Sequence, residues 1–257
     1  MQPPRVIKLL VFSDIVRTLP AVLAPLLTAR LQICPWCYIG QREMDTAIDR
    51  CRDKPVQFEI EYRPYKLQPS LLEGQVIPKK EYYDSRFGPA KAESIAFAVE
   101  KRAEEIGLDI KMFSGDIAQT TIAHRLLLKA WQLGGQRLQL PLLNYMFKAY
   151  FADGVNMADE EVLAKAAAEH TIMSEEEALA FLRSDECQAE VEQMMIDVRK
   201  KGVTGVPFVV IDSKWAVSGG QSADTYVQIF NKIANAQVDK PASPPHVPPA
   251  PTCDEDS

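Results

Sequence analysis

The stretch ICPWCYIG, residues 33–40, holds two of the five cysteines of this 257-residue chain, and their spacing decides which fold the sequence predicts. Apolar residues recur after the pair at helical spacing, which predicts that the pair opens a helix. These residues are Met44, Ala47, Ile48 and Cys51. Cys34 and Cys37 are three residues apart, so they share one helix face. Pro35 suits the first turn, where its missing N–H costs nothing.

The position of Cys34 at the start of a helix is expected to affect the acidity of its thiol. The N–H groups and the macrodipole of the helix stabilise a thiolate there and lower the thiol pKa. We therefore expect Cys34 to be the attacking nucleophile and Cys37, one turn further, to be the resolving thiol.

Zinc binding is the main alternative for a Cys-x-x-Cys pair, and it requires a second close pair of Cys or His ligands. The remaining candidates are all isolated in the sequence: Cys51, Cys187, Cys253, His124, His170 and His246. The pattern therefore favours a redox pair over a zinc site or plain structural cysteines, and we expect no metal.

Composition narrows the class of protein. The chain is 47% hydrophobic and 25% charged, as in an ordinary globular protein, and a net charge of -6 argues against nucleic acid or an anionic membrane as partner. The first apolar run is too short for a secretory signal, and prolines interrupt the run at 19–31 before it reaches membrane-spanning length. We expect a cytoplasmic protein, in which a close cysteine pair is seldom structural.

The order of elements predicts an α/β fold. VIKLLVF (6–12) has the continuous apolar character of a strand buried on both faces, and QFEIEY (57–62) alternates as a strand does. The period is helical throughout 78–202. Two strands, PFVVID and WAVSG, follow around a turn at Asp212-Ser213, and a last helix begins near Ser222.

Particular signals support the helical region. Ser174 and Glu177 fit a capping box, and Lys200-Lys201-Gly202 is a typical basic helix end with a glycine stop. Two apolar stripes have helical spacing: Ile95, Val99, Ala103 and Ile106, then Leu142, Leu143, Met146, Phe147 and Tyr150.

These elements predict a thioredoxin-like α/β domain with an inserted α-helical subdomain. The α/β domain is expected to be discontinuous, from residues 1–77 and 203–236, and the helical subdomain to span 78–202. Residues 237–257 form a Pro-rich tail without apolar periodicity, which predicts disorder.

GVTGVPFVVID, residues 202–212, is the second motif. A proline directly before a buried strand removes a ladder donor, so it belongs at the strand start, and Val206-Pro207 is a candidate for a cis bond. Without the cysteine pair, Gly205 and Pro207 would indicate only a turn between a helix and a strand. Together with the cysteine pair, the functional interpretation is favoured.

The motifs C-P-W-C-Y-I-G, G-V-x-G-V-P-F-x-V-I-D and V-S-G-x-Q resemble the DsbA family of thioredoxin-fold oxidoreductases, in its cytosolic FrnE-like branch. The resemblance implies dithiol–disulfide exchange without a metal or organic cofactor. It makes Cys34 the nucleophile, Cys37 the resolving cysteine and Pro207 the cis-proline. The substrate-binding residues that it implies are Trp36, Val206 and Pro207, with the Val206 backbone facing an extended substrate strand.

Related branches leave alternatives open. Kappa-class glutathione transferases and 2-hydroxychromene-2-carboxylate isomerases share the architecture but typically have serine where Cys34 stands, so two sulfurs favour redox chemistry. A glutathione-dependent transferase or isomerase, or a redox-silent binding module, is the alternative function. The expected partners are protein or small-molecule disulfides and dithiols. Glutathione as a co-substrate and a homodimer are left open.

A third stretch, QTTIAHRLL (119–127), also resembles the family, which commonly has Asn-Thr before Ala-His-Arg. Gln119 replaces that Asn here, which places its contact with the active site in doubt. His124 lies in a strongly apolar helix, where a packed or capping histidine is favoured over a proton shuttle.

Residues 17–33 separate the first strand from the pair, although a strand-to-helix loop usually has about 2 to 6 residues. Removing them joins SDIV to CPWCYIG, which resembles an uninterrupted family sequence. The segment is either a translated intron or gene-model error, which the sequence favours, or an apolar lid over the pair.

We predict that deleting residues 17–33 gives a better enzyme and not a damaged one, because the first strand then feeds the Cys34 turn directly and the apolar side chains of the segment no longer cover the pair or stay exposed. Thermal midpoints and insulin-reduction rates of both forms test this. A deletion form that is less stable and less active, with transcripts that uniformly encode the segment, would show that it is a working part of the protein.

Overall fold

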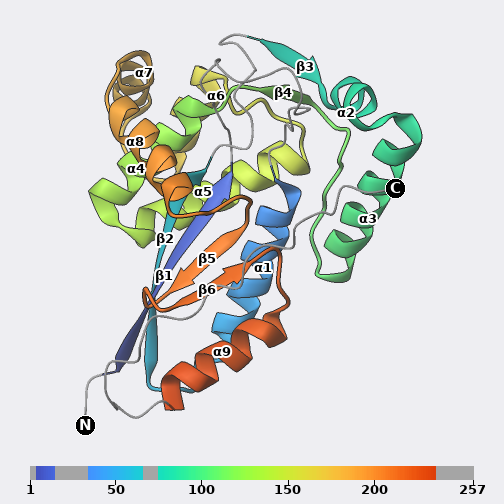
Figure 1. Cartoon of the computed structure of the whole chain (residues 1–257). Coiled ribbons are helices and arrows are strands. Elements are labelled where there is room, and N and C mark those ends of the chain that lie inside the picture. Colours follow the sequence, from blue (N-terminus) through green and yellow to red (C-terminus); the bar gives the residue numbers. More distant parts are fainter. Residues whose placement is uncertain (1–3, 15–33, 66–74, 236–257) are drawn as a thin grey trace.

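The computed structural model describes residues 4–14, 34–65 and 75–235, which form a central sheet surrounded by helices (Figure 1). The predicted insertion at 17–33 and the predicted disorder of the tail fall outside the described residues. The layered α/β arrangement that the sequence predicts is confirmed in the described part.

The central sheet has the strand order β2-β1-β5-β6. Its strands are β1 (Arg5–Asp14), β2 (Val56–Tyr65), β5 (Phe208–Ile211) and β6 (Trp215–Ser218). β1 is parallel to β2 and antiparallel to β5, so Leu9 lies opposite Ile60 on one side and Ile211 on the other. β5 and β6 form a hairpin whose turn has positive φ at Asp212 and Ser213, the geometry that matches the twist of paired strands.

The prediction that β1 is buried on both faces is correct only near its carboxyl end, because Val6 is 45% exposed and Lys8 is exposed. Leu9 and Val11 belong to the main core, together with residues of the helices α1 (Pro35–Asp49) and α9 (Ala223–Asn235). Phe12 points to the other face and packs in a second cluster with Tyr65, Val198 and Val203. The alternation of side chains along a strand is what places these neighbours in different cores.

Helices make up most of the chain between β2 and β5. They are α2 (Lys79–Phe87), α3 (Pro89–Glu105), α4 (Thr121–Gly134), α5 (Gln136–Phe151), α6 (Glu160–Glu169), α7 (Glu175–Arg183) and α8 (Gln188–Lys200). The predicted apolar stripe of α5 is fully buried. The capping box of Ser174 with Glu177 is present at the start of α7, and α8 ends before Gly202 at positive φ.

The prediction of a helical period throughout 78–202 is wrong at two places. β3 (Val76–Pro78) and β4 (Asp116–Ala118) pair as a short antiparallel ribbon, with Ile77 opposite Ile117. A three-residue strand is too short to show alternation, and its partner is forty residues away in sequence. Local periodicity therefore carries no signal for this pairing.

The open edge of β2 is protected by two glutamine side chains from α5. Gln136 accepts a hydrogen bond from the Ile60 N–H at 2.7 Å and donates to the Phe58 carbonyl at 3.2 Å. Gln139 repeats this arrangement on Tyr62, at 2.7 Å and 2.9 Å. Each side-chain amide thus takes the hydrogen-bonding place of a neighbouring strand. It pairs with backbone N–H and C=O groups of β2 that would otherwise be buried without partners.

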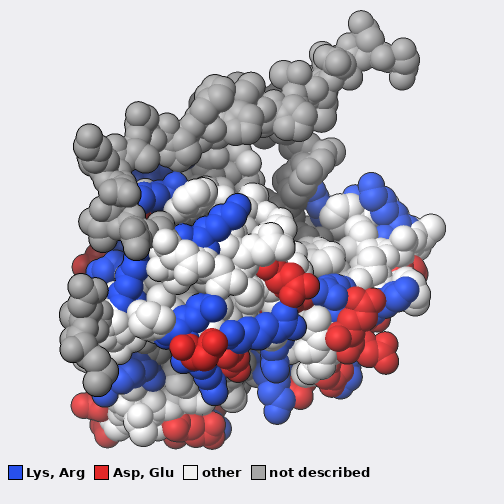
Figure 2. Space-filling view, turned by 90° about the horizontal axis from the view of Figure 1, so that it is seen from below, with Lys and Arg blue, Asp and Glu red and all other residues white. Residues whose placement is uncertain are grey.

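The surface carries mixed charge. Figure 2 shows basic and acidic side chains interspersed over the face seen from below, which is the pattern of an ordinary solvated surface. Among the described residues, no helix is both long and apolar enough to cross a membrane.

Replacing Gln139 with alanine should destabilise the fold by about 2 to 4 kcal/mol, because the buried amide makes three hydrogen bonds to backbone groups, including one to Leu127. Urea unfolding followed by circular dichroism measures the loss. Gln193→Ala is the control, since Gln193 is exposed and bonds only within α8. Equal stability of the two variants would contradict the role given to Gln139.

Candidate functional site

Cys34 is the N-cap residue of α1, as its sequence position predicts. Its backbone is extended, with φ -83° and ψ 106°, and Pro35 follows in the first turn. The Cys37 N–H donates to the Cys34 carbonyl at 2.9 Å, which holds the two residues in one turn. Neither forms a disulfide, and both residues are nearly buried, at 5% and 2% exposure.

The chain segment before β5 lies against this turn. The Val206–Pro207 peptide bond is cis, as the sequence suggests, and Pro207 is buried. The Cys34 thiol donates a hydrogen bond to the Val206 carbonyl, with 3.4 Å between sulfur and oxygen. Residues 172 positions apart in sequence are thereby joined at one site.

Gly40 allows this close packing. A Cβ atom at position 40 would lie 3.2 Å from Cγ of Pro207 and 3.7 Å from Cα of Gly220. The first distance is shorter than an ordinary van der Waals contact. The proline ring can therefore pack directly on α1 only because Gly40 has no side chain. Gly220 in turn lies against Trp36, a residue that is 39% exposed and stands between the two cysteines in sequence.

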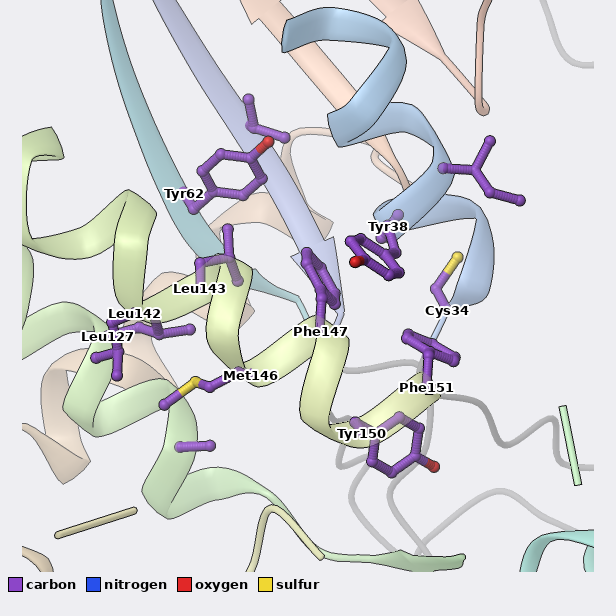
Figure 3. Packing of buried hydrophobic residues seen from close by; sticks show 14 of the residues in the cluster. Cys34, Tyr38, Tyr62, Leu127, Leu142, Leu143, Met146, Phe147, Tyr150 and Phe151 are labelled. Carbon is purple, nitrogen blue, oxygen red and sulfur yellow. The ribbon is translucent and has the colours of Figure 1, made fainter. Parts of the chain in front are cut away.

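Aromatic rings from α5 line the inner side of the site. Tyr38 stacks on Phe147 and Phe151, with ring centroids 5.2 Å and 5.9 Å apart, and Figure 3 shows Cys34 at the edge of this group. Burial, and then the charge of Cys34, raise the pKa of Tyr83 far above its usual range. The surroundings of the Cys34 thiol are thus apolar and include a phenol that is neutral at ordinary pH.

A buried carboxylate, that of Glu43, links α1 to α3 and α9 by hydrogen bonds. Glu43 accepts a hydrogen bond from the Arg102 guanidinium of α3 and a second one, at 2.8 Å, from the Ala223 N–H at the start of α9. A carboxylate is favoured at a helix N-terminus, where N–H groups are free to donate. Sequence reasoning missed Glu43, although it lies three residues after Gly40 and four before Ala47 on the buried side of the helix.

The other described cysteines are less suited to thiolate chemistry. Burial raises the pKa of the Cys51 thiol. Burial, followed by the charges of Glu190 and Glu186, raises the pKa of Cys187. Both groups therefore remain thiols near neutral pH. Within the described ranges, no cluster of three or more His, Cys, Asp or Glu side chains is arranged to hold a metal.

Residues of the third motif line two cavities whose lining does not include Cys34 or Cys37. His124 is buried and lines a small cavity with Ser13 and Leu143, near the carboxyl end of β1. Gln119 accepts a hydrogen bond from Thr121 and lines a different, polar cleft. The neighbouring Arg125 has a structural role that was not predicted, since its guanidinium donates to four backbone carbonyls, those of Phe181, Leu182, Ser184 and Glu186.

A family model described as a DSBA-like thioredoxin domain matches residues 32–231, which include both cysteines and Pro207. The chain belongs to the DSBA-like thioredoxin family. The match confirms the resemblance and the thioredoxin-like fold that the motifs predict. No curated protein matches the chain.

Solved structures agree with this family. A probable DsbA oxidoreductase from Streptomyces coelicolor is 25% identical, with a TM-score of 0.75 over 92% of this chain and 94% of that one. The cytosolic disulfide reductase DsbM from Pseudomonas aeruginosa is 15% identical, with a TM-score of 0.53 over 88% and 98%. A 2-hydroxychromene-2-carboxylate isomerase is 11% identical, with a TM-score of 0.58 over 88% and 94%. The last two show the shared fold alone.

This DSBA-like protein should have one fast thiol. In a Cys253→Ser background, iodoacetamide near neutral pH is expected to label Cys34 first, because a helix N-terminus lowers a thiol pKa from about 8.5 to between about 3.5 and 7.5. Peptide mapping at increasing pH measures the order. The fast phase should survive Cys37→Ser and disappear in Cys34→Ser; labelling of Cys37 or Cys51 before Cys34 would show that the assignment is wrong.

Proposed function

We propose that this DSBA-like protein is a thiol–disulfide oxidoreductase, in which Cys34 is the nucleophile and Cys37 the resolving cysteine. The observation that carries the proposal is the placement of Cys34 at the N-cap of α1, one turn before Cys37 and within hydrogen-bond distance of the Val206 carbonyl. The reaction requires no metal or organic cofactor, because both reacting groups belong to the chain.

Disulfide reduction follows in two exchanges. The Cys34 thiolate attacks a substrate disulfide, whose S–S bond breaks, and one substrate sulfur leaves as a thiolate that takes up a proton. The Cys37 thiolate then attacks the Cys34 sulfur, so that the Cys34–Cys37 bond forms and the second substrate sulfur leaves. Two electrons pass from the pair to the substrate. The reverse sequence oxidises a dithiol, and the redox partner sets the direction.

The Val206 carbonyl connects the state of the nucleophile with substrate binding. It accepts a hydrogen bond from the Cys34 thiol, but a thiolate or a disulfide has no proton to donate. The carbonyl is then available to a backbone N–H of an extended substrate. The exposed ring of Trp36 supplies apolar contact area beside it. Trp36, Val206 and Pro207 are therefore the proposed substrate-binding residues.

The substrates are proposed to be protein or small-molecule disulfides and dithiols, and the cytoplasm to be the compartment, where a reducing thiol pool keeps such a pair active. Glutathione is a candidate co-substrate. Replacing dithiothreitol with glutathione as the reductant in the assay described next tests whether it supplies electrons to the pair.

Insulin reduction by dithiothreitol should be accelerated by the protein, and Cys34→Ser should return the rate to background because no attacking thiolate remains. Cys37→Ser should accumulate a mixed disulfide, visible by mass spectrometry, because resolution is lost. Cys187→Ser is the matched control and should keep the full rate. A fully active Cys34→Ser variant would reject the proposed function.

A further inference from the structure

The outer edge of β2, which faces away from β1, is only partly covered by α5. Gln136 donates from its side-chain amide to the Phe58 carbonyl at 3.2 Å and accepts from the Ile60 N–H at 2.7 Å. In a parallel strand pair, one residue likewise donates to a carbonyl and accepts from the N–H two positions further along the neighbouring strand. The Gln136 amide therefore occupies the place of one peptide residue on this edge.

The preceding step on the same edge, formed by the Val56 carbonyl and the Phe58 N–H, is open. The N–H and C=O of a strand residue point to the same side, so both groups point away from β1, as the Phe58 carbonyl does. Neither has a hydrogen-bond partner among the described residues, whereas the Val56 N–H donates to the Lys54 carbonyl at 2.8 Å. An unpaired step of this kind is a template for a further extended chain.

A cavity of about 650 Å³ lies beside this open step, between the end of α1, the start of β2 and the start of α5. The apolar part of its lining is Ile48, Cys51, Val56, Phe58, Ile60, Leu140 and Pro141. Both the volume and the apolar walls are typical of a ligand pocket. In an extended chain paired with the edge, side chains point alternately to the two faces, so one apolar side chain can enter the cavity.

The charge of the cavity favours an anionic group. Among the described residues that line it, two are charged, Arg52 and Arg137, and none is acidic. Arg52 pairs with Asp49 at 2.7 Å, whereas Arg137 is exposed and has no ion pair or hydrogen bond within the described ranges. The first turn of α5 contains no acidic residue, so the positive end of its macrodipole adds to the arginine charge.

The direction of the open step shows where the anionic group would lie. A peptide residue that donates to Val56 and accepts from Phe58 runs parallel to β2. Such a peptide advances toward the start of α5, where Gln136 already occupies the next step of the edge. Because the peptide cannot continue along the edge past Gln136, a chain that ends there brings its terminal carboxylate to Arg137.

We propose that the edge groove, formed by Val56, Phe58, Gln136 and Arg137 around the cavity, binds the C-terminal end of an extended peptide from another protein. The peptide adds a parallel strand to β2, places an apolar side chain in the cavity and binds Arg137 with its carboxylate. Ile48 in the cavity wall is fourteen positions after Cys34, or about 20 Å along α1. The proposal therefore does not depend on the proposed function.

Fluorescence anisotropy with the full-length protein tests the proposal. The probe is a fluorescein-labelled peptide, Gly-Ser-Gly-Leu-Leu, with a free C-terminal carboxylate, and its binding should be saturable. Amidation of the C-terminus should weaken binding about tenfold, because hydrogen bonds to a charged group are the stronger ones. N-methylation of one of the two leucine nitrogens should weaken it about fivefold, since the donor to Val56 is lost, whereas N-methylation of the serine should not. Equal binding of all these peptides would overturn the proposal.

A matched pair of variants locates the carboxylate. Arg137→Gln should weaken binding of the free acid about tenfold and leave binding of the amidated peptide unchanged. Lys148→Gln is the control, because Lys148 is exposed on the same helix, outside the cavity lining, and its replacement removes the same charge. Thermal midpoints check that both variants are folded. Unchanged binding by Arg137→Gln, or an equal loss in the two variants, would show that the carboxylate does not bind at this site.

Two further comparisons separate the edge groove from the redox site and from a general apolar-anion site. Trp36→Ala should bind the peptide as the parent does, and Arg137→Gln should keep the parent rate of insulin reduction. Loss of peptide binding in Trp36→Ala would place the peptide at the redox site and overturn the edge groove, while the proposed function would stand. Octanoate has a carboxylate and an apolar chain but no amide, so it should compete about tenfold more weakly than the unlabelled peptide. Equal competition by octanoate would reject strand addition.

Discussion

The close approach of α1 to the Val206–Pro207 segment is the constraint on which the site depends. The helix presents a glycine, Gly40, where the proline ring arrives, and any side chain there would crowd Cγ of Pro207. This contact places the Val206 carbonyl within hydrogen-bond distance of the Cys34 thiol. The Cys34 thiol is therefore positioned by two segments that are far apart in the sequence and meet only in the folded protein.

Two acidic residues on α1 lie in different surroundings. Glu43 has two donors, the Arg102 guanidinium and the Ala223 N–H, and it connects the active-site helix with α3 and α9. Asp45, two positions later, has no such partner, and burial raises its pKa. Removing one partner of a buried charge leaves the other without compensation, so the partners of Glu43 keep the three helices in one arrangement. Glu43 therefore fixes α1 against α3 and α9.

Local sequence patterns predicted the elements that have local causes. The capping box of Ser174, the α5 stripe and the helix opened by the cysteine pair all depend on residues within a few positions of one another. β3 and β4 were not predicted, because each is stabilised by its partner strand and not by a pattern within its own three residues. The roles of Gln136 and Gln139 were not predicted for the same reason, because the sequence around a helical glutamine does not indicate which strand edge its side chain will contact.

The sequence by itself determined the cysteine pair at a helix start, the proline at the start of β5 and the α/β order of elements, because spacing and backbone restrictions act on neighbouring residues. Only the tertiary structure decided that the Cys34 thiol meets the Val206 carbonyl, that Gly40 receives Pro207, and that Glu43 has hydrogen-bond donors while the Tyr62 hydroxyl has no partner among the described residues. The physical reason is that burial and hydrogen-bond satisfaction depend on what surrounds a group in space, and those surroundings come from elements far away along the chain.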